Sequence, residues 1–206
     1  MDRMRVMQLA VDESEPGTAK MTIYGDISST DWMLLYTGES DGLTTRALDV
    51  AQALAGLPDD VSSVEVHINS YGGEVAEGAA IYNALRGCGR EVTTVCDGFA
   101  CSIASVIFMA GTRRVMEPAS MLMLHNPLLE RVSGNARQLR KAADDLDAIA
   151  GVSKAAYLGA ATIGADELDA VMDAETWVTP AQAVEWGLAT EVAEDGASGA
   201  PVQVAD

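Results

Sequence analysis

Regular alternation of apolar and polar side chains indicates the strands of this 206-residue chain. The clearest case is residues 63–68, where Val64, Val66 and Ile68 lie on one side of the predicted strand and polar residues lie between them. This two-residue period is typical of a half-buried strand. Alternation, or β-branched and apolar content, predicts four further strands over 20–25, 91–96, 113–116 and 120–124.

Apolar residues spaced three and four positions apart predict the helices. The longest is 135–158, in which Leu139, Leu146 and Ile149 belong to one apolar stripe. Shorter helices are predicted over 44–57, 75–85 and 165–172, and from Pro180 with Thr179 as N-cap. Because strands alternate with helices along the chain, we expect a single α/β domain with a largely parallel sheet.

Composition and charge argue against some classes of partner and location. Thirteen basic against thirty-one acidic residues give a net charge of -18, which argues against nucleic acid because phosphate binding needs clustered Lys and Arg. No apolar run is long enough to span a membrane, and the first residues do not resemble a signal peptide. We therefore expect a cytoplasmic protein. Three cysteines without a CxxC pair and two distant histidines predict free thiols and no metal site.

Three short segments carry candidate chemistry. Ser102 opens an apolar run that predicts a buried helix, whose first amide, that of Ile103, could bind an oxyanion. Gly72 and Gly73 lie between a predicted strand and a predicted helix, and His125 lies at a strand end. Each has a simpler explanation: Ser102 as a helix cap, Gly72-Gly73 as an ordinary connection, and a lone histidine as a structural residue.

Two neighbours are rivals for these roles. Cys101 is intrinsically the more reactive nucleophile, but adjacent residues point in different directions, so only one of Cys101 and Ser102 can face His125. His67 falls on the polar face of its strand, where a surface or interface residue is the simpler interpretation. Ser102 and His125 are therefore the favoured pair.

These motifs resemble the Clp protease family, and most closely its ClpP-like phage and prophage head maturation proteases. The segments that carry the resemblance are 23–27, 68–73, 98–111, 121–127 and 174–188. The likeness covers about residues 20–192, which implies an N-terminal segment over 1–19, a peptidase domain over 20–192 and a disordered acidic tail over 193–206. It also implies a ClpP/crotonase-type fold with stacked, largely parallel β-sheet and a protruding handle helix, here 135–158.

The resemblance also implies residue roles. Ser102 and His125 match the family's catalytic serine and histidine, and the acid of a Ser-His-acid triad falls on Glu175, with Asp173 as a substitute candidate. Glutamate replaces the aspartate of the housekeeping enzymes. The family's oxyanion donors fall on the Gly72-Gly73 turn and the Ile103 amide, next to Tyr71, which stands where proline is usual.

We accordingly predict an ATP-independent serine endopeptidase without cofactor or metal. The resemblance implies a ring-forming homo-oligomer whose peptide substrates are capsid or scaffold segments, in the cytoplasm of a bacterial host or within the prohead. Two alternatives stay open. One is a catalytically degenerate ring or scaffold subunit, and the other is a crotonase-type acyl-CoA enzyme, which would not need Ser102 or His125.

Overall fold

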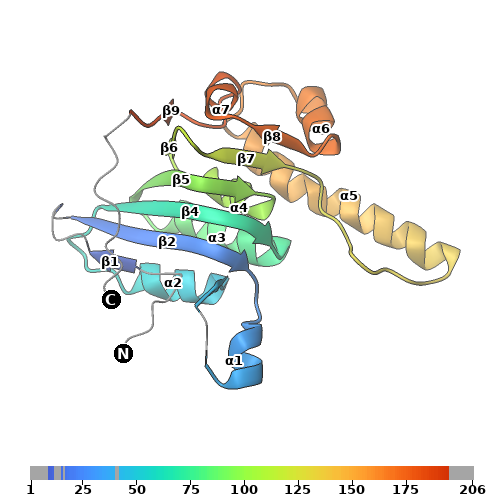
Figure 1. Cartoon of the computed structure of the whole chain (residues 1–206), viewed down its shortest axis with the longest axis horizontal. Helices are drawn as coiled ribbons and strands as arrows, with labels where there is room; N and C mark the ends of the chain where they lie inside the picture. Colours follow the sequence, from blue (N-terminus) through green and yellow to red (C-terminus); the bar gives the residue numbers. More distant parts are fainter. Residues whose placement is uncertain (1–8, 12–14, 16, 40–41, 195–206) are drawn as a thin grey trace.

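A mixed β-sheet forms the centre of the computed structural model, which describes residues 9–11, 15, 17–39 and 42–194 (Figure 1). Within these residues the sheet has nine strands: β1 (Leu9–Val11), β2 (Thr18–Ile27), β3 (Thr44–Thr45), β4 (Ser63–Gly73), β5 (Glu91–Cys101), β6 (Arg113–Met116), β7 (Met121–Leu124), β8 (Thr176–Val178) and β9 (Glu191–Val192). Their order is β1-β2-β4-β5-β6-β9, with β3 beside β2 and β7 between β5 and β8. Only β1–β2 and β7–β8 pair antiparallel, so the predicted α/β fold with a largely parallel sheet is confirmed.

The helices lie around the sheet in Figure 1, with α1 apart from the others. They are α1 (Trp32–Thr37), α2 (Ala47–Ala55), α3 (Val75–Gly87), α4 (Ile103–Phe108), α5 (Ala136–Leu158), α6 (Ala165–Asp173) and α7 (Pro180–Glu185). The group α2, α3 and α4 covers one face of the sheet, α6 and α7 lie beyond β8, and α5 protrudes as a long arm. No helix in the described part of the chain is both long and apolar enough to cross a membrane.

The buried helix α4 is the packing centre on the covered face. All six of its residues are buried, as expected for a helix that is apolar on every side. It contacts α3 closely, because a Cβ at Gly78 would lie 2.1 Å from Ile103 Cγ1. Side chains such as Ile68, Ile107 and Phe108 are fully buried, and each contributes about 1.5–3 kcal/mol of hydrophobic stabilisation.

Two predicted strands extend further than their sequence pattern indicated. The β4 strand continues through Gly73 and β5 through Cys101. Pairing across the sheet is the cause: Ile27 pairs with Gly73 and Ser70 with Ala100, past register shifts in both ladders. The glycines that suggested a turn therefore lie on the last pairs of a strand.

Several short elements were not predicted. They are β1, β3, α1, β8 and β9. The α1 helix has no buried residue and is defined by its ends, with Asp31 accepting from the Leu34 amide and Gly38 at φ 76°. The predicted Thr179 N-cap is confirmed, in a capping box with Gln182. Of the tail predicted over 193–206, residues 195–206 lie outside the described residues, and Ala193 donates to the Met116 carbonyl.

Polar side chains cluster around His67 on the sheet, at β4 and its neighbours. His67 Nδ1 lies 2.8 Å from Asp97 Oδ1, and its Nε2 lies 3.0 Å from Glu65 Oε1. Tyr24 donates to Asp97 at 2.5 Å. Burial lowers the pKa of His67, but the hydrogen bonds to Asp97 and Glu65 outweigh it and raise this pKa to about 9. His67 is therefore a structural cation in the fold.

Replacing this cation changes how stability depends on pH. Because the folded-state pKa of His67 lies above the ordinary value of 6.5, its stabilisation is complete below pH ~6.5 and is lost as the pH rises to about 9. We expect wild type to lose stability relative to His67→Gln over this interval, as measured by chemical denaturation at pH 6, 7.5 and 9.5. A constant difference between the two proteins at all three pH values would contradict the assignment.

Candidate active site

Ser102 forms the turn between β5 and α4. Its backbone has φ 54° and ψ -129°, a conformation that non-glycine residues rarely adopt and that costs about 1–3 kcal/mol. Its amide donates to the Met123 carbonyl at 2.8 Å, and the Ser105 hydroxyl donates to the Ser102 carbonyl at 2.6 Å. Ser102 stands at the N-cap position, but its side chain makes no capping hydrogen bond. The explanation of Ser102 as a helix cap is therefore wrong.

The Ser102 hydroxyl instead meets His125. His125 directly follows β7, and its Nε2 lies 2.7 Å from Ser102 Oγ. Both side chains are only partly buried, so a substrate can reach them. A hydroxyl at hydrogen-bond distance from an imidazole nitrogen is the geometry in which the imidazole can accept the hydroxyl proton.

Gly72 lies against the Ser102 turn, and Gly73 follows Gly72 in the chain. A Cβ at Gly72 would come within 2.8 Å of both the Cys101 carbonyl oxygen and Ser102 Cβ, and 3.3 Å from the Ile103 amide nitrogen. Their φ angles are 104° and 150°, a range that disfavours side chains. Ile103 begins α4, and the first amides of a helix lack intrahelical acceptors. The structure thus brings together the residues predicted for an oxyanion site.

The rival nucleophile Cys101 is placed differently. Its side chain is fully buried at the end of β5, and burial raises the pKa of its thiol to about 11. Since the thiolate is the reactive form of cysteine, this thiol is inert at neutral pH. All three cysteines are free.

The third member of the predicted triad is less clearly placed. Among the described residues, neither Glu175 nor Asp173 has a hydrogen bond to His125; Asp173 Oδ1 instead accepts from Asn126 Nδ2 at 2.7 Å. The β7–β8 register pairs Leu124 with Thr176. His125 directly follows the last paired residue of β7, and Glu175 directly precedes the first paired residue of β8; Glu175 is exposed and at φ 50°.

A cavity of about 800 Å³ opens onto Ser102 and His125. Its lining includes Gly73 and His125, and also Trp32 and Met33 of α1. Sequence analysis missed α1 as part of the site. The available signal was its position, because α1 follows the carboxyl end of a parallel strand, where α/β proteins gather their sites.

A strained serine between a strand and a helix, hydrogen-bonded to a histidine at the neighbouring strand end, is the arrangement of a serine hydrolase. Comparison with known proteins makes the class specific. The Clp protease family model matches residues 15–196. The chain therefore belongs to the Clp protease family, a family of ClpP-like serine proteases.

Individual relatives agree with this assignment. The chain is 28% identical to the ATP-dependent Clp protease proteolytic subunit of Porphyromonas gingivalis over 189 residues, which cover 89% of this chain and 83% of that protein. The protein of the same name from Bdellovibrio bacteriovorus is 29% identical, covering 89% and 88%. That from the alga Chara vulgaris is 28% identical, covering 79% and 75%.

The close approach of Gly72 to the Ser102 turn generates a prediction. Gly72→Ala places a methyl group 2.8 Å from the Cys101 carbonyl oxygen at a φ of 104°, so the turn must move. Because a shift of about 1 Å can cost 10²-fold in rate, we expect reaction of Ser102 with a fluorophosphonate to slow by about 10²-fold or more. Gly87→Ala is the matched control, since a Cβ there meets nothing within 4 Å. Equal labelling rates for the two variants would refute the close approach.

Proposed function

We propose that the chain is a serine endopeptidase in which Ser102 is the nucleophile and His125 the general base. The observation that carries this proposal is the 2.7 Å separation of Ser102 Oγ and His125 Nε2 at a strained strand-to-helix turn. His125 accepts the hydroxyl proton while Ser102 Oγ bonds to the peptide carbonyl carbon. His125 then donates that proton to the leaving amine, and water hydrolyses the acyl-enzyme.

The negative charge of the tetrahedral intermediate needs donors fixed in advance. The proposed donors are the amides of Gly73 and Ile103, with Gly72 allowing the two backbone segments to approach. The contact of Gly72 with the Ser102 turn supports this role, because it brings the end of β4 against the start of α4. No cofactor is required for these steps.

Glu175 is the proposed orienting acid. Its support is the antiparallel register, whose last pair, Leu124 with Thr176, adjoins both Glu175 and His125 in the chain; its carboxylate would hold the His125 tautomer and stabilise the imidazolium. The absence of a hydrogen bond between these two side chains among the described residues favours a second candidate function. In that case the chain is a ring or scaffold subunit with an unreactive Ser102.

The more specific biological role is also a proposal. The segment 175–177, Glu-Thr-Trp, resembles the phage and prophage branch, which supports an ATP-independent head maturation protease acting on capsid or scaffold segments. Assembly into homo-oligomeric rings, with the handle helix α5 mediating contacts between rings, and residence in the bacterial cytoplasm or the prohead belong to the same proposal. Cleavage of the cognate capsid proteins without ATP or an added ATPase would test it.

Fluorophosphonate labelling read by intact mass distinguishes the two functions. With wild type we expect one adduct: Ser102 Oγ bonds to phosphorus, fluoride leaves and the proton passes to His125. Ser102→Ala should give no adduct, and its peptidase activity should be lower than that of wild type by about 10⁴-fold or more. Labelling that persists in Ser102→Ala refutes the nucleophile assignment. A folded, correctly assembled wild type without adduct identifies the scaffold function.

A matched pair of substitutions identifies the acid. Glu175→Gln keeps the size of the side chain but removes its charge, so we expect kcat to fall by about 10²–10⁴-fold. Asp173→Asn keeps an oxygen that can accept from Asn126, so its kcat should remain within about threefold of wild type. Peptidase assays on both variants decide between the two acids. A larger loss of kcat in Asp173→Asn than in Glu175→Gln would assign the orienting role to Asp173.

A further inference from the structure

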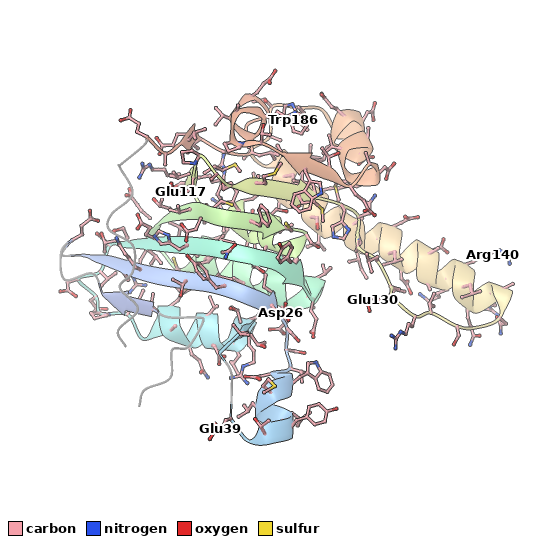
Figure 2. All side chains as sticks on the ribbon, in the orientation of Figure 1. Asp26, Glu39, Glu117, Glu130, Arg140 and Trp186 are labelled. Carbon is pink, nitrogen blue, oxygen red and sulfur yellow. The ribbon has the colours of Figure 1, made fainter. Side chains whose placement is uncertain are left out.

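The cavity at Ser102 is lined by carboxylates from separate parts of the chain. Asp26 lies near the end of β2, Glu74 directly precedes α3, and Glu130 lies between β7 and α5. Figure 2 shows Asp26 near α1 and Glu130 on the segment that leads to α5. These acidic groups share one cavity with the Ser102–His125 pair.

No lysine or arginine is among the described residues that line this cavity. Arg131 follows Glu130 in the chain but is not part of the lining, and Arg46 is engaged by Asp49 at 2.7 Å. Asp31 also lines the cavity, but it caps α1 and its charge acts on Arg46. The negative charge of the lining therefore rests mainly on Asp26, Glu74 and Glu130.

Glu74 is the most firmly fixed of these acids. Its Oε1 accepts from the Ser28 hydroxyl at 2.7 Å and from the Ser29 hydroxyl at 3.2 Å. These hydrogen bonds lower the pKa of Glu74, so the group is ionised at neutral pH. It lines the same cavity as Ser102 and His125, which places a fixed negative charge in the proposed substrate site.

An apolar surface accompanies the charges. Trp32 lines the same cavity and is 58% exposed. Lysine and arginine combine an apolar stem with a cationic head, and a cation can also lie over an indole face. The lining therefore offers contacts for both parts of a basic side chain.

We propose that this cavity selects polypeptide segments that carry a lysine or arginine next to the scissile bond. The inference rests on the proposed endopeptidase function and adds a substrate class to it. A buried ion pair would need strong interactions to offset the cost of removing both charges from water. These carboxylates are exposed, so each contributes about two- to fivefold in selectivity for a cationic side chain. The chain's net charge of -18 adds to this preference, because it favours the approach of cationic segments.

Internally quenched peptides test the proposal. Three peptides differ only beside the scissile bond: lysine on the acyl side, lysine on the leaving-group side, or norleucine at both positions. Norleucine reproduces the lysine stem without its ammonium group. For wild type we expect kcat/KM of the better lysine peptide to exceed that of the norleucine peptide by about tenfold, and this ratio should fall with added salt.

Isosteric variants assign the effect to the lining. Asp26→Asn, Glu74→Gln and Glu130→Gln should each lower the lysine-to-norleucine ratio by about two- to fivefold, and Asp26→Asn with Glu130→Gln should lower it further. Glu117→Gln is the matched control, because Glu117 follows β6 far from the cavity (Figure 2) and is not in its lining. An unchanged ratio in the double variant overturns the assignment.

Binding of the same peptides to Ser102→Ala, measured by fluorescence anisotropy, separates this proposal from the proposed function. Cleavage of all three peptides by wild type at equal kcat/KM overturns the preference for basic residues and leaves the endopeptidase function supported. Preferential binding of a lysine peptide to Ser102→Ala, with no cleavage by wild type, keeps the recognition and removes the catalysis. Equal binding without cleavage overturns both.

Discussion

The positive φ of Ser102 is the constraint on which the site depends. A serine does not hold this conformation unaided, and hydrogen bonds with Met123 and Ser105 hold its backbone. The Met123 carbonyl of β7 accepts a hydrogen bond from the Ser102 amide. The same strand delivers His125 two residues later, so one strand both supports the turn that carries the proposed nucleophile and positions the proposed base. The 2.7 Å contact between the two side chains follows from this shared support.

Ser105 connects that turn to the protruding helix. Its hydroxyl donates to the Ser102 carbonyl and lies 2.7 Å from the hydroxyl of Tyr157, which is 1% exposed. All buried residues of α5 lie between Ala150 and Tyr157, so the helix is anchored only by its C-terminal third. Its remaining length extends from the domain (Figure 1). The proposed contact between rings would cover apolar residues on α5, such as Leu139 and Ile149, that are exposed in the single chain.

Sequence periodicity predicted the α/β fold well because the strands of the sheet and the helices on its covered face bury one side against another layer. The 63–68 alternation is a direct consequence of burial, since Val64, Val66 and Ile68 are buried. The 135–158 stripe predicted a helix, although the buried residues of α5 all lie between Ala150 and Tyr157. Elements without a buried face, such as α1, left no such pattern. The extension of β4 to Gly73 was also hidden, because glycine indicates a break and only pairing with Ile27 shows that the strand continues. Residue chemistry and family resemblance suggested Ser102 and His125, whereas their contact required the pairing of β5 with β7.

The members of the proposed triad differ in what holds them. Ser102 and His125 are fixed by strands of the central sheet, and any shift of either would disturb buried neighbours such as Cys101 and Leu124. Glu175 lies on an exposed turn before a three-residue strand, where a longer side chain meets few packing constraints. A change of acid from aspartate to glutamate is therefore easier to accommodate than any change of the serine or the histidine. This difference fits the proposal that glutamate serves as the orienting acid at position 175.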